Sequence, residues 1–257
     1  MFQLLKAALE FSDPKRFKLL VKIGLQYIFL QLLLAPFYPY AIYRIKKIDK
    51  DYSLDKLLEF TFTFCFGLIR PLQIRYELIE LLKILKKEKP KYILEIGTSF
   101  GGTLFLFTRM ASNDAKIISI DLQGGNFGGG YIITRVKLYN GFALNKQEIH
   151  LIRKNSHKEE TLEEIKDILS GNKLDFLFID GDHTYEGVKR DFELYSSLVK
   201  NDGIIALHDI VKTDFQGCEV SKFWDEIKSK YEKIEIVKDK NQNWAGIGVI
   251  KNIIRDK

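Results

Sequence analysis

From residue 73 onward, short apolar runs alternate with stretches in which apolar residues recur at helical spacing. In residues 73–87, for example, Leu78, Leu81 and Leu85 fall on one face of a helix, which Pro90 ends. Five apolar runs have the length and composition of buried strands: residues 92–96, 116–120, 149–153, 174–179 and 203–208. This alternation predicts an α/β fold with a Rossmann-like, mostly parallel sheet and helices on both of its faces.

Two further apolar runs close the chain. Residues 233–237 and 245–250 are strand-like, and Asn241-Gln242-Asn243 supplies a turn between them. A short connection between two strands favours antiparallel pairing. We therefore predict seven strands, of which the last two form an antiparallel hairpin.

The N-terminal segment has a different pattern. Ile23–Tyr43 is an uncharged run of 21 residues with basic residues on both sides. Its length would allow a membrane span, but Pro36 and Pro39 interrupt it and leave only Ile23–Ala35 as uninterrupted helix. Three interpretations stay open: contact with a membrane surface, contact with the core or another subunit, and a true span. No small-residue cleavage site follows an apolar run near the start, so we expect no signal peptide.

The positive charge of the chain is concentrated at this end. Residues 1–50 hold nine Lys or Arg against three acids, whereas the other 207 residues hold 31 of each sign. The neutral remainder argues against a nucleic-acid enzyme with a basic groove, and the basic, aromatic segment suits an anionic membrane surface. The two cysteines give no disulfide framework. We expect a cytoplasmic protein, peripheral on the inner face of the membrane if this segment docks there.

Residues 54–69 are apolar and aromatic, and their pattern is compatible with two structures. Four phenylalanines alternate as in a strand, at positions 60, 62, 64 and 66, whereas the leucines beside them fit a helix. In either form the stretch could be a wall or lid over a site. Gly67 and Pro71 mark a break. We therefore divide the chain into an N-terminal segment, residues 1–70, and a main domain, residues 71–257.

The first strand of the main domain leads into a glycine-rich turn. Residues 92–103 read Tyr-Ile-Leu-Glu-Ile-Gly-Thr-Ser-Phe-Gly-Gly-Thr, and a helix-like stretch follows. This order is typical of a nucleotide site, because glycines admit a ligand close to the backbone and a helix start offers free N–H groups. The spacing does not fit the dinucleotide fingerprint. Glu95 would repel a pyrophosphate and suits a ligand with an amino group or other positive charge.

Further candidates for a nucleoside site follow the second and third strands. Asp121 ends the second strand, where nucleotide-binding α/β domains hold a ribose diol. The glycine-rich residues 123–130 beside it predict a mobile loop, which is either a gate over the site or a flexible connector. Asn155 and Ser156 end the third strand and could hydrogen-bond an adenine edge, although Ser156 is also placed to cap the next helix.

A second group of reactive side chains follows the fourth and fifth strands. The fourth strand delivers Asp180, Asp182 and His183, and the fifth delivers His208 and Asp209. Ligands bind at the carboxyl edge of such sheets, so these three aspartates and two histidines should lie together there. Oxygen and imidazole ligands of this kind suit a divalent cation. The structural alternative is a hydrogen-bonded network that orders the strand ends.

Together, the two signatures resemble the metal-dependent branch of the class I methyltransferases, which use S-adenosyl-L-methionine. That branch includes catechol, caffeoyl-coenzyme A and macrolide sugar O-methyltransferases, and cephalosporin-hydroxylase-like proteins are similar. The resemblance covers residues 73–250 and is specific in Leu-Glu-Ile-Gly-Thr and Ile-Asp-Gly-Asp-His-Thr-Tyr-Glu. It implies an O-methyltransferase that binds S-adenosyl-L-methionine and a divalent cation.

The resemblance also implies roles for single residues. At the metal position stand Asp180, His208 and Asp209, with His183 where the family keeps a general base. The implied cofactor contacts follow the first four strands: Glu95, Gly97, Thr98, Ser99, Gly101, Gly102, Asp121, Asn155, Ser156, Asp180 and Asp182. The first of these would meet the methionine amino group, and Asp121 would meet the ribose.

One position departs from the family pattern. His208 stands where an acid is usual, which lowers the negative charge of the site. The family pattern implies Mg²⁺, but a histidine ligand could shift the preference toward Mn²⁺, Fe²⁺ or Zn²⁺. If no metal binds, His208 could instead act as an acid or a base.

We expect the methyl acceptor to be a hydroxyl group on a small molecule or sugar, and we expect no nucleic-acid partner. A lipid-linked sugar is a further candidate that rests on the charge asymmetry alone, and a homo-oligomer stays open. Two other functions remain as alternatives. One is a non-catalytic nucleoside-binding scaffold, and the other is a metal-dependent hydroxylase-like enzyme on the same fold.

Overall fold

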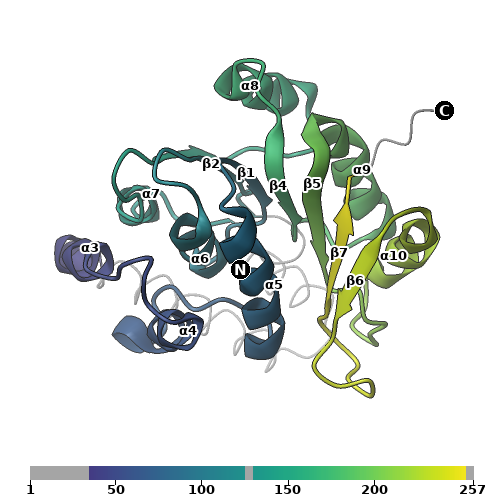
Figure 1. The fold of residues 1–257 in the computed structure, drawn as a ribbon, viewed down its shortest axis with the longest axis horizontal. Helices are drawn as coiled ribbons and strands as arrows, with labels where there is room; N and C mark the ends of the chain where they lie inside the picture. The colour runs from purple at the N-terminus through teal and green to yellow at the C-terminus, as the bar shows by residue number, and fades with distance from the viewer. Residues whose placement is uncertain (1–34, 125–129, 253–257) are drawn as a thin grey trace, which may run out of the picture.

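A computed structural model describes residues 35–124 and 130–252 (Figure 1). Its centre is a seven-stranded sheet with the order β3-β2-β1-β4-β5-β7-β6. The strands are β1 (Tyr92–Ile96), β2 (Lys116–Ile120), β3 (Glu148–Ile152), β4 (Leu174–Ile179), β5 (Val199–His208), β6 (Lys233–Ile236) and β7 (Ile247–Lys251). Strands β1 to β5 pair in parallel, whereas β7 runs antiparallel to both β5 and β6. The predicted fold class, including the antiparallel C-terminal pair, is confirmed.

Strand register places the predicted site residues at one edge of this sheet. In the pairing of β4 with β5, Ile179 lies opposite Leu207, so Asp180 and His208 are neighbours at the strand ends. The alignment continues past β1, because the N–H of Asp180 donates to the carbonyl of Ile96 over 2.8 Å. The carboxyl ends of β1, β4 and β5 therefore lie side by side.

Helices cover both faces of the sheet, and each face has its own apolar core (Figure 1). Successive residues of a strand point to opposite faces, so Ile93 packs in one core and Leu94 in the other. The first face is covered by α4 (Leu54–Thr63), α5 (Arg75–Glu88), α6 (Gly102–Met110) and α7 (Arg135–Asn140). The second face is covered by α8 (Glu159–Leu169), α9 (Tyr185–Tyr195) and α10 (Val220–Ile227).

The first described helix, α3 (Tyr38–Lys46), starts where the sequence analysis placed an interruption. Pro39 lies in its first turn, where a missing N–H costs nothing because that group has no partner within the helix. The predicted helix over Ile23–Ala35 lies almost entirely outside the described residues. Within the described ranges, no helix is both long and apolar enough to cross a bilayer.

The stretch with the alternating phenylalanines is helical. Ser53 caps the N-terminus of α4, since its hydroxyl accepts from the N–H of Lys56 over 3.3 Å, and the helix buries Leu57, Leu58 and Thr61. A 3-10 turn over Phe64–Phe66 follows. The chain then reaches α5 through residues 67–73, here called the strap. Helices α3 and α4 share the core of α5 and α6, and the division proposed at residue 70 stays a prediction.

Candidate active site

The glycines of the turn after β1 allow its backbone to pack closely against neighbouring segments. Gly97 has φ +100°, and a Cβ there would lie 2.0 Å from the carbonyl oxygen of Asp180. Gly101 caps α6, and a Cβ on the next residue, Gly102, would lie 2.5 Å from the backbone nitrogen of Pro71 in the strap. Glycine is required at positions 97 and 102 for this reason. The turn therefore touches both the end of β4 and the strap.

Glu95 lies in β1 beneath this turn and is fully buried. Ser119 is its partner across the sheet, and the serine hydroxyl donates to Oε2 over 2.6 Å. Oγ1 of Thr98 lies 2.6 Å from the same hydroxyl. Burial raises the pKa of Glu95 to about 8, and hydrogen bonds from Ser119 and Thr103 oppose that rise. The group is thus a largely neutral carboxyl near neutral pH, enclosed by protein groups.

Asp121, at the end of β2, holds two loops together. One carboxylate oxygen accepts from the N–H of Ser99 over 2.6 Å, and the other accepts from the N–H of Gly130 over 2.7 Å. Burial raises the pKa of Asp121 to about 6, while these backbone donors favour the charged form. The carboxylate therefore faces the turn after β1, and its contact with a ribose stays a prediction. Most of the predicted glycine gate, residues 125–129, lies outside the described residues.

The two residues predicted at the adenine edge form the loop between β3 and α8. Oδ1 of Asn155 accepts from the N–H of His157 over 2.8 Å, and the carbonyl of Ser156 accepts from the Tyr195 hydroxyl over 2.5 Å. Nε2 of His157 lies 3.3 Å from the carboxylate of Asp191, which is fully buried. A hydrogen bond with this carboxylate raises the pKa of His157, which burial would lower. Neither His157 nor Asp191 was predicted as part of the site.

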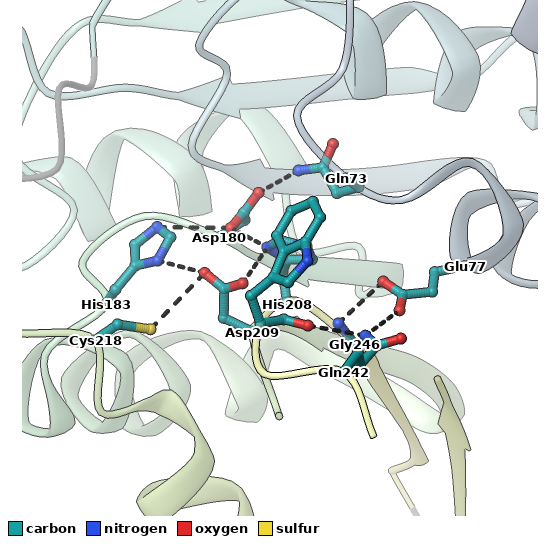
Figure 2. Close-up of polar contacts among 10 residues, drawn as sticks. Gln73, Glu77, Asp180, His183, His208, Asp209, Cys218, Gln242 and Gly246 are labelled. Carbon is teal, nitrogen blue, oxygen red and sulfur yellow. Dashed lines mark hydrogen bonds and ion pairs between the residues drawn. The ribbon is translucent and has the colours of Figure 1, made fainter. Parts of the chain in front are cut away.

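Four of the predicted residues meet in one cluster at the ends of β4 and β5 (Figure 2). Nδ1 of His208 lies 3.0 Å from Oδ1 of Asp180 and 3.3 Å from Oδ1 of Asp209. Nδ1 of His183 lies 2.7 Å from Oδ2 of Asp209, and its Nε2 lies 3.7 Å from Oδ1 of Asp180. Four of the five side chains predicted to lie together do so, whereas Asp182 does not, and the binding of a metal here stays a prediction.

Mutual charge sets the protonation of this cluster. Burial alone would lower the pKa of His183, but the hydrogen bond with Asp209 and the charge of Asp180 raise it to about 10. The same balance of burial against the two carboxylates leaves the pKa of His208 well above its usual value. The pKa of Asp209 lies far below its usual range, since the charge of His208 outweighs burial. The two carboxylates thus favour the protonated form of both imidazoles when no cation is bound.

The cluster contains two overlapping sets of metal-binding atoms. In one set, ligand atoms of Asp180, His208 and Asp209 all lie within 4.8 Å of one another, and in the other, those of His183, Asp209 and Cys218 do so. Nε2 of His208 is buried and has no hydrogen-bond partner among the described residues. Two carboxylates and an imidazole at this spacing fit a divalent cation. Cys218 was not predicted, since a lone cysteine has no sequence signal.

The start of α5 joins this cluster to the loop between β6 and β7 (Figure 2). Nε2 of Gln73 donates to Oδ2 of Asp180 over 2.5 Å. One turn later, the buried carboxylate of Glu77 accepts from Nε2 of Gln242 over 2.7 Å and from the N–H of Gly246 over 3.0 Å. Neither Gln73 nor Glu77 was predicted. For Glu77 the sequence did hold a signal, because this acid falls on the otherwise apolar face of the predicted helix.

Asp182 turns away from the cluster. Its Oδ1 accepts from the N–H of Thr184 over 3.0 Å and from the hydroxyl of the same residue over 2.8 Å. A Cβ on Gly187 would lie 2.2 Å from the Asp182 carboxyl carbon, so this glycine makes room for the acid. In the described structure Asp182 orders the start of α9, and its contact with a cofactor stays a prediction.

The part of the chain that forms this site is similar to known proteins. Residues 94–210, from β1 to just beyond β5, match a family described as a methyltransferase domain. This match covers less than half of the chain and shows what these residues are similar to. The resemblance predicted from the two sequence signatures is therefore confirmed.

Solved structures with the same fold include O-methyltransferases. One from Bacillus cereus, in complex with SAH, is 17% identical, with a TM-score of 0.51 over 80% of this chain and 93% of that chain. A Staphylococcus aureus protein provisionally named a caffeoyl-CoA O-methyltransferase is 21% identical, with a TM-score of 0.52 over 79% of this chain and 93% of that chain. At these identities the likeness shows the fold.

Two curated proteins match this chain over 142 residues, or 54% of its length. The uncharacterized protein y4gI of Sinorhizobium fredii is 26% identical, and 15% of its length is covered. The uncharacterized protein R132 of Acanthamoeba polyphaga mimivirus is 32% identical, and 61% of its length is covered. The chain thus spans less than two thirds of either relative.

Proposed function

We propose that this protein is an S-adenosyl-L-methionine-dependent O-methyltransferase assisted by a divalent cation. The observation that carries the proposal is the cluster of Asp180, His183, His208 and Asp209 directly beside the glycine turn of a methyltransferase domain. A cofactor on the turn and a hydroxyl acceptor on the cluster would meet at one edge of the sheet. Much of the rate would then come from holding the methyl group and the attacking oxygen in line.

The cofactor would lie along the ends of β1 to β3. The backbone of residues 97–102 would face its methionine part, and Asn155 and Ser156 would face adenine. Asp121 would exchange its bonds to the Ser99 and Gly130 N–H groups for the ribose hydroxyls. An approaching ammonium group would favour the ionised form of Glu95, whose pKa of about 8 reflects burial.

Asp180, His208 and Asp209 would hold the cation. Their donor atoms have the spacing and chemistry that a divalent ion needs. Of the candidates, Mn²⁺, Fe²⁺ and Zn²⁺ accept an imidazole more readily than Mg²⁺ does. When bound, the cation would lower the pKa of the acceptor hydroxyl.

His183 would accept the proton from that hydroxyl. Asp209 accepts from Nδ1, which fixes the imidazole tautomer and leaves Nε2 to act as the base. In the cation-free cluster, Asp180 and Asp209 keep this histidine protonated. A cation held by these carboxylates would compensate their charge and lower the pKa of His183, so that this group could act as a base.

The test is turnover of S-adenosyl-L-methionine, measured by mass spectrometry as S-adenosylhomocysteine formed with dihydroxyaromatic and sugar acceptors. We expect product only with a divalent cation, a loss of at least about 100-fold in Asp209→Asn, and unchanged turnover in Asp214→Asn, an exposed acid nearby. Cofactor binding without product from any acceptor would favour the nucleoside-binding scaffold. An oxidised product that requires iron would favour the hydroxylase-like enzyme.

A further inference from the structure

An exposed group of aromatic and basic side chains lies on α3 and on the turn after α4. We call this group the aromatic–basic face; it comprises Phe37, Tyr40, Tyr43, Arg44, Lys46, Lys47 and Phe66. Its four aromatic side chains are between 54% exposed and fully exposed. The two parts rest on one core, because Ile42 of α3 and Cys65, the neighbour of Phe66, both pack against the same apolar cluster. Exposed aromatic groups of this size mark an interaction surface rather than an ordinary protein surface.

The exposure of this face does not come from a loose helix. The opposite side of α3 buries Tyr38, Ala41 and Ile45 in the main core. The buried guanidinium of Arg109 donates to the carbonyls of Ile45 and Ile48 over 2.9 and 2.8 Å, which satisfies the end of the helix. With one side fixed in this way, the helix presents its aromatic rings outward.

Within the described part of the chain, the basic residues of this face have no acidic partners. Some lysines elsewhere on the surface pair with nearby acids, as Lys83 does with Glu80 over 2.6 Å. In residues 35–124 and 130–252, no ion pair is formed by Arg44, Lys46 or Lys47. Two of these groups instead lie against the aromatic rings: Nζ of Lys47 lies 4.3 Å from the Tyr43 ring centroid, and Arg44 donates to the Tyr40 hydroxyl over 2.9 Å.

The side chain of Phe66 is exposed, and the backbone around it is strained. Three successive residues, Cys65, Phe66 and Gly67, have φ values of 45°, 59° and 80°. A left-handed conformation is unfavourable for the first two of these, and an exposed phenyl ring gains nothing from water. Strain of this kind at a surface points to a role that folding does not explain.

We propose that the aromatic–basic face docks on an anionic lipid bilayer. Aromatic side chains prefer the boundary between headgroups and acyl chains, and unpaired lysine and arginine side chains are attracted to anionic headgroups. A protein partner would supply acidic side chains for the same cations. The projecting ring of Phe66 favours a bilayer, since it can enter an apolar phase without a preformed pocket.

Docking of this face would bring the active site close to the membrane. The strap begins at Gly67, next to Phe66, and the carbonyl of Leu68 accepts from Nη1 of Arg135 over 3.0 Å. The strap ends at Gln73, which donates to Asp180. The acceptor would then be a hydroxyl group on a membrane lipid or on a lipid-linked molecule. This last step alone rests on the proposed function.

Vesicle flotation of the full chain tests the docking. We use phosphatidylcholine vesicles with and without phosphatidylglycerol, and we expect flotation with the anionic vesicles that weakens at high salt. Tyr40→Ser/Tyr43→Ser/Phe66→Asn and Lys46→Glu/Lys47→Glu should each weaken the partition at least about tenfold. Asparagine is chosen at position 66 because it tolerates the left-handed conformation.

Matched controls lie elsewhere on the surface. Lys86→Glu/Lys87→Glu at the end of α5 and Ile234→Ser on β6 change the same kinds of exposed side chain and should keep flotation. Retained thermal unfolding shows that each variant folds. No flotation with anionic vesicles would overturn the proposal. Equal flotation of all variants would also overturn it and assign binding to another part of the chain, such as residues 1–34. Cofactor binding, measured separately, reports on the enzyme alone.

Discussion

At Glu95, burial and a neighbouring hydroxyl act on one carboxyl group in opposite directions. The sequence placed an acid in a buried strand beside a glycine turn, which was enough to predict a cationic ligand group. It could not show that Ser119 lies directly opposite, because strand register is a property of the folded sheet. The cluster residues were predicted for a related reason, since each follows a strand. Gln73 and Cys218 reach the cluster through tertiary contacts alone.

The raised pKa of Glu95 makes stability depend on pH. The folded state holds this proton up to a pKa of about 8, against an ordinary value of 4.5. Its contribution to stability is therefore complete below the ordinary value and is lost as the pH rises through the folded value. Between about pH 5 and 9, we expect the free energy of unfolding of the native protein to fall, relative to Glu95→Gln, by a few kcal/mol at most.

Urea unfolding at several pH values measures this difference, and Glu148→Gln, an exposed acid on β3, is the control. The control should follow the native protein at every pH. Parallel curves for the native protein and Glu95→Gln would show that the group is ionised in the folded state throughout.

At the scale of elements, the strands were predictable and their close approaches were not. The apolar runs marked β1, β2 and β4 because a buried strand needs an uninterrupted apolar stretch. The sequence left residues 54–69 undecided between helix and strand. Burial of Leu57, Leu58 and Thr61 at helical spacing against α5 and α6 decides for α4. Likewise, the sequence analysis interpreted Pro39 as a break in a helix, whereas the structure places it in the first turn of α3, which accommodates proline.

The turn after β1 depends on the missing side chain of Gly97. Alanine there would combine an unfavourable φ of +100° with a Cβ 2.0 Å from the Asp180 carbonyl oxygen. Gly171 is a matched control, since its φ is +81° but nothing lies within 4 Å of a Cβ. In chemical denaturation, we expect Gly97→Ala to lose at least about 2 kcal/mol more than Gly171→Ala. Equal losses would mean that the turn and the end of β4 can separate freely.

At the scale of the whole molecule, residues from the strap, from β1 to β5 and from the loop between β6 and β7 lie at one edge of the sheet. The sequence supported a seven-stranded methyltransferase fold through two local signatures. It did not reveal that α3 belongs to the same core as α6, because the bonds from Arg109 in α6 to the carbonyls of Ile45 and Ile48 span more than 60 positions of the chain. The central claim is that this edge binds S-adenosyl-L-methionine.

Calorimetric titration of S-adenosyl-L-methionine into the protein, with and without EDTA, tests this claim most directly. We predict micromolar binding, about −8 kcal/mol, that Asp121→Ala weakens at least about tenfold by removing the ribose contact. Asp114→Ala, an exposed acid near the opposite end of β2, should bind like the native protein. No binding by the native protein, or equal binding by Asp121→Ala, would contradict the account.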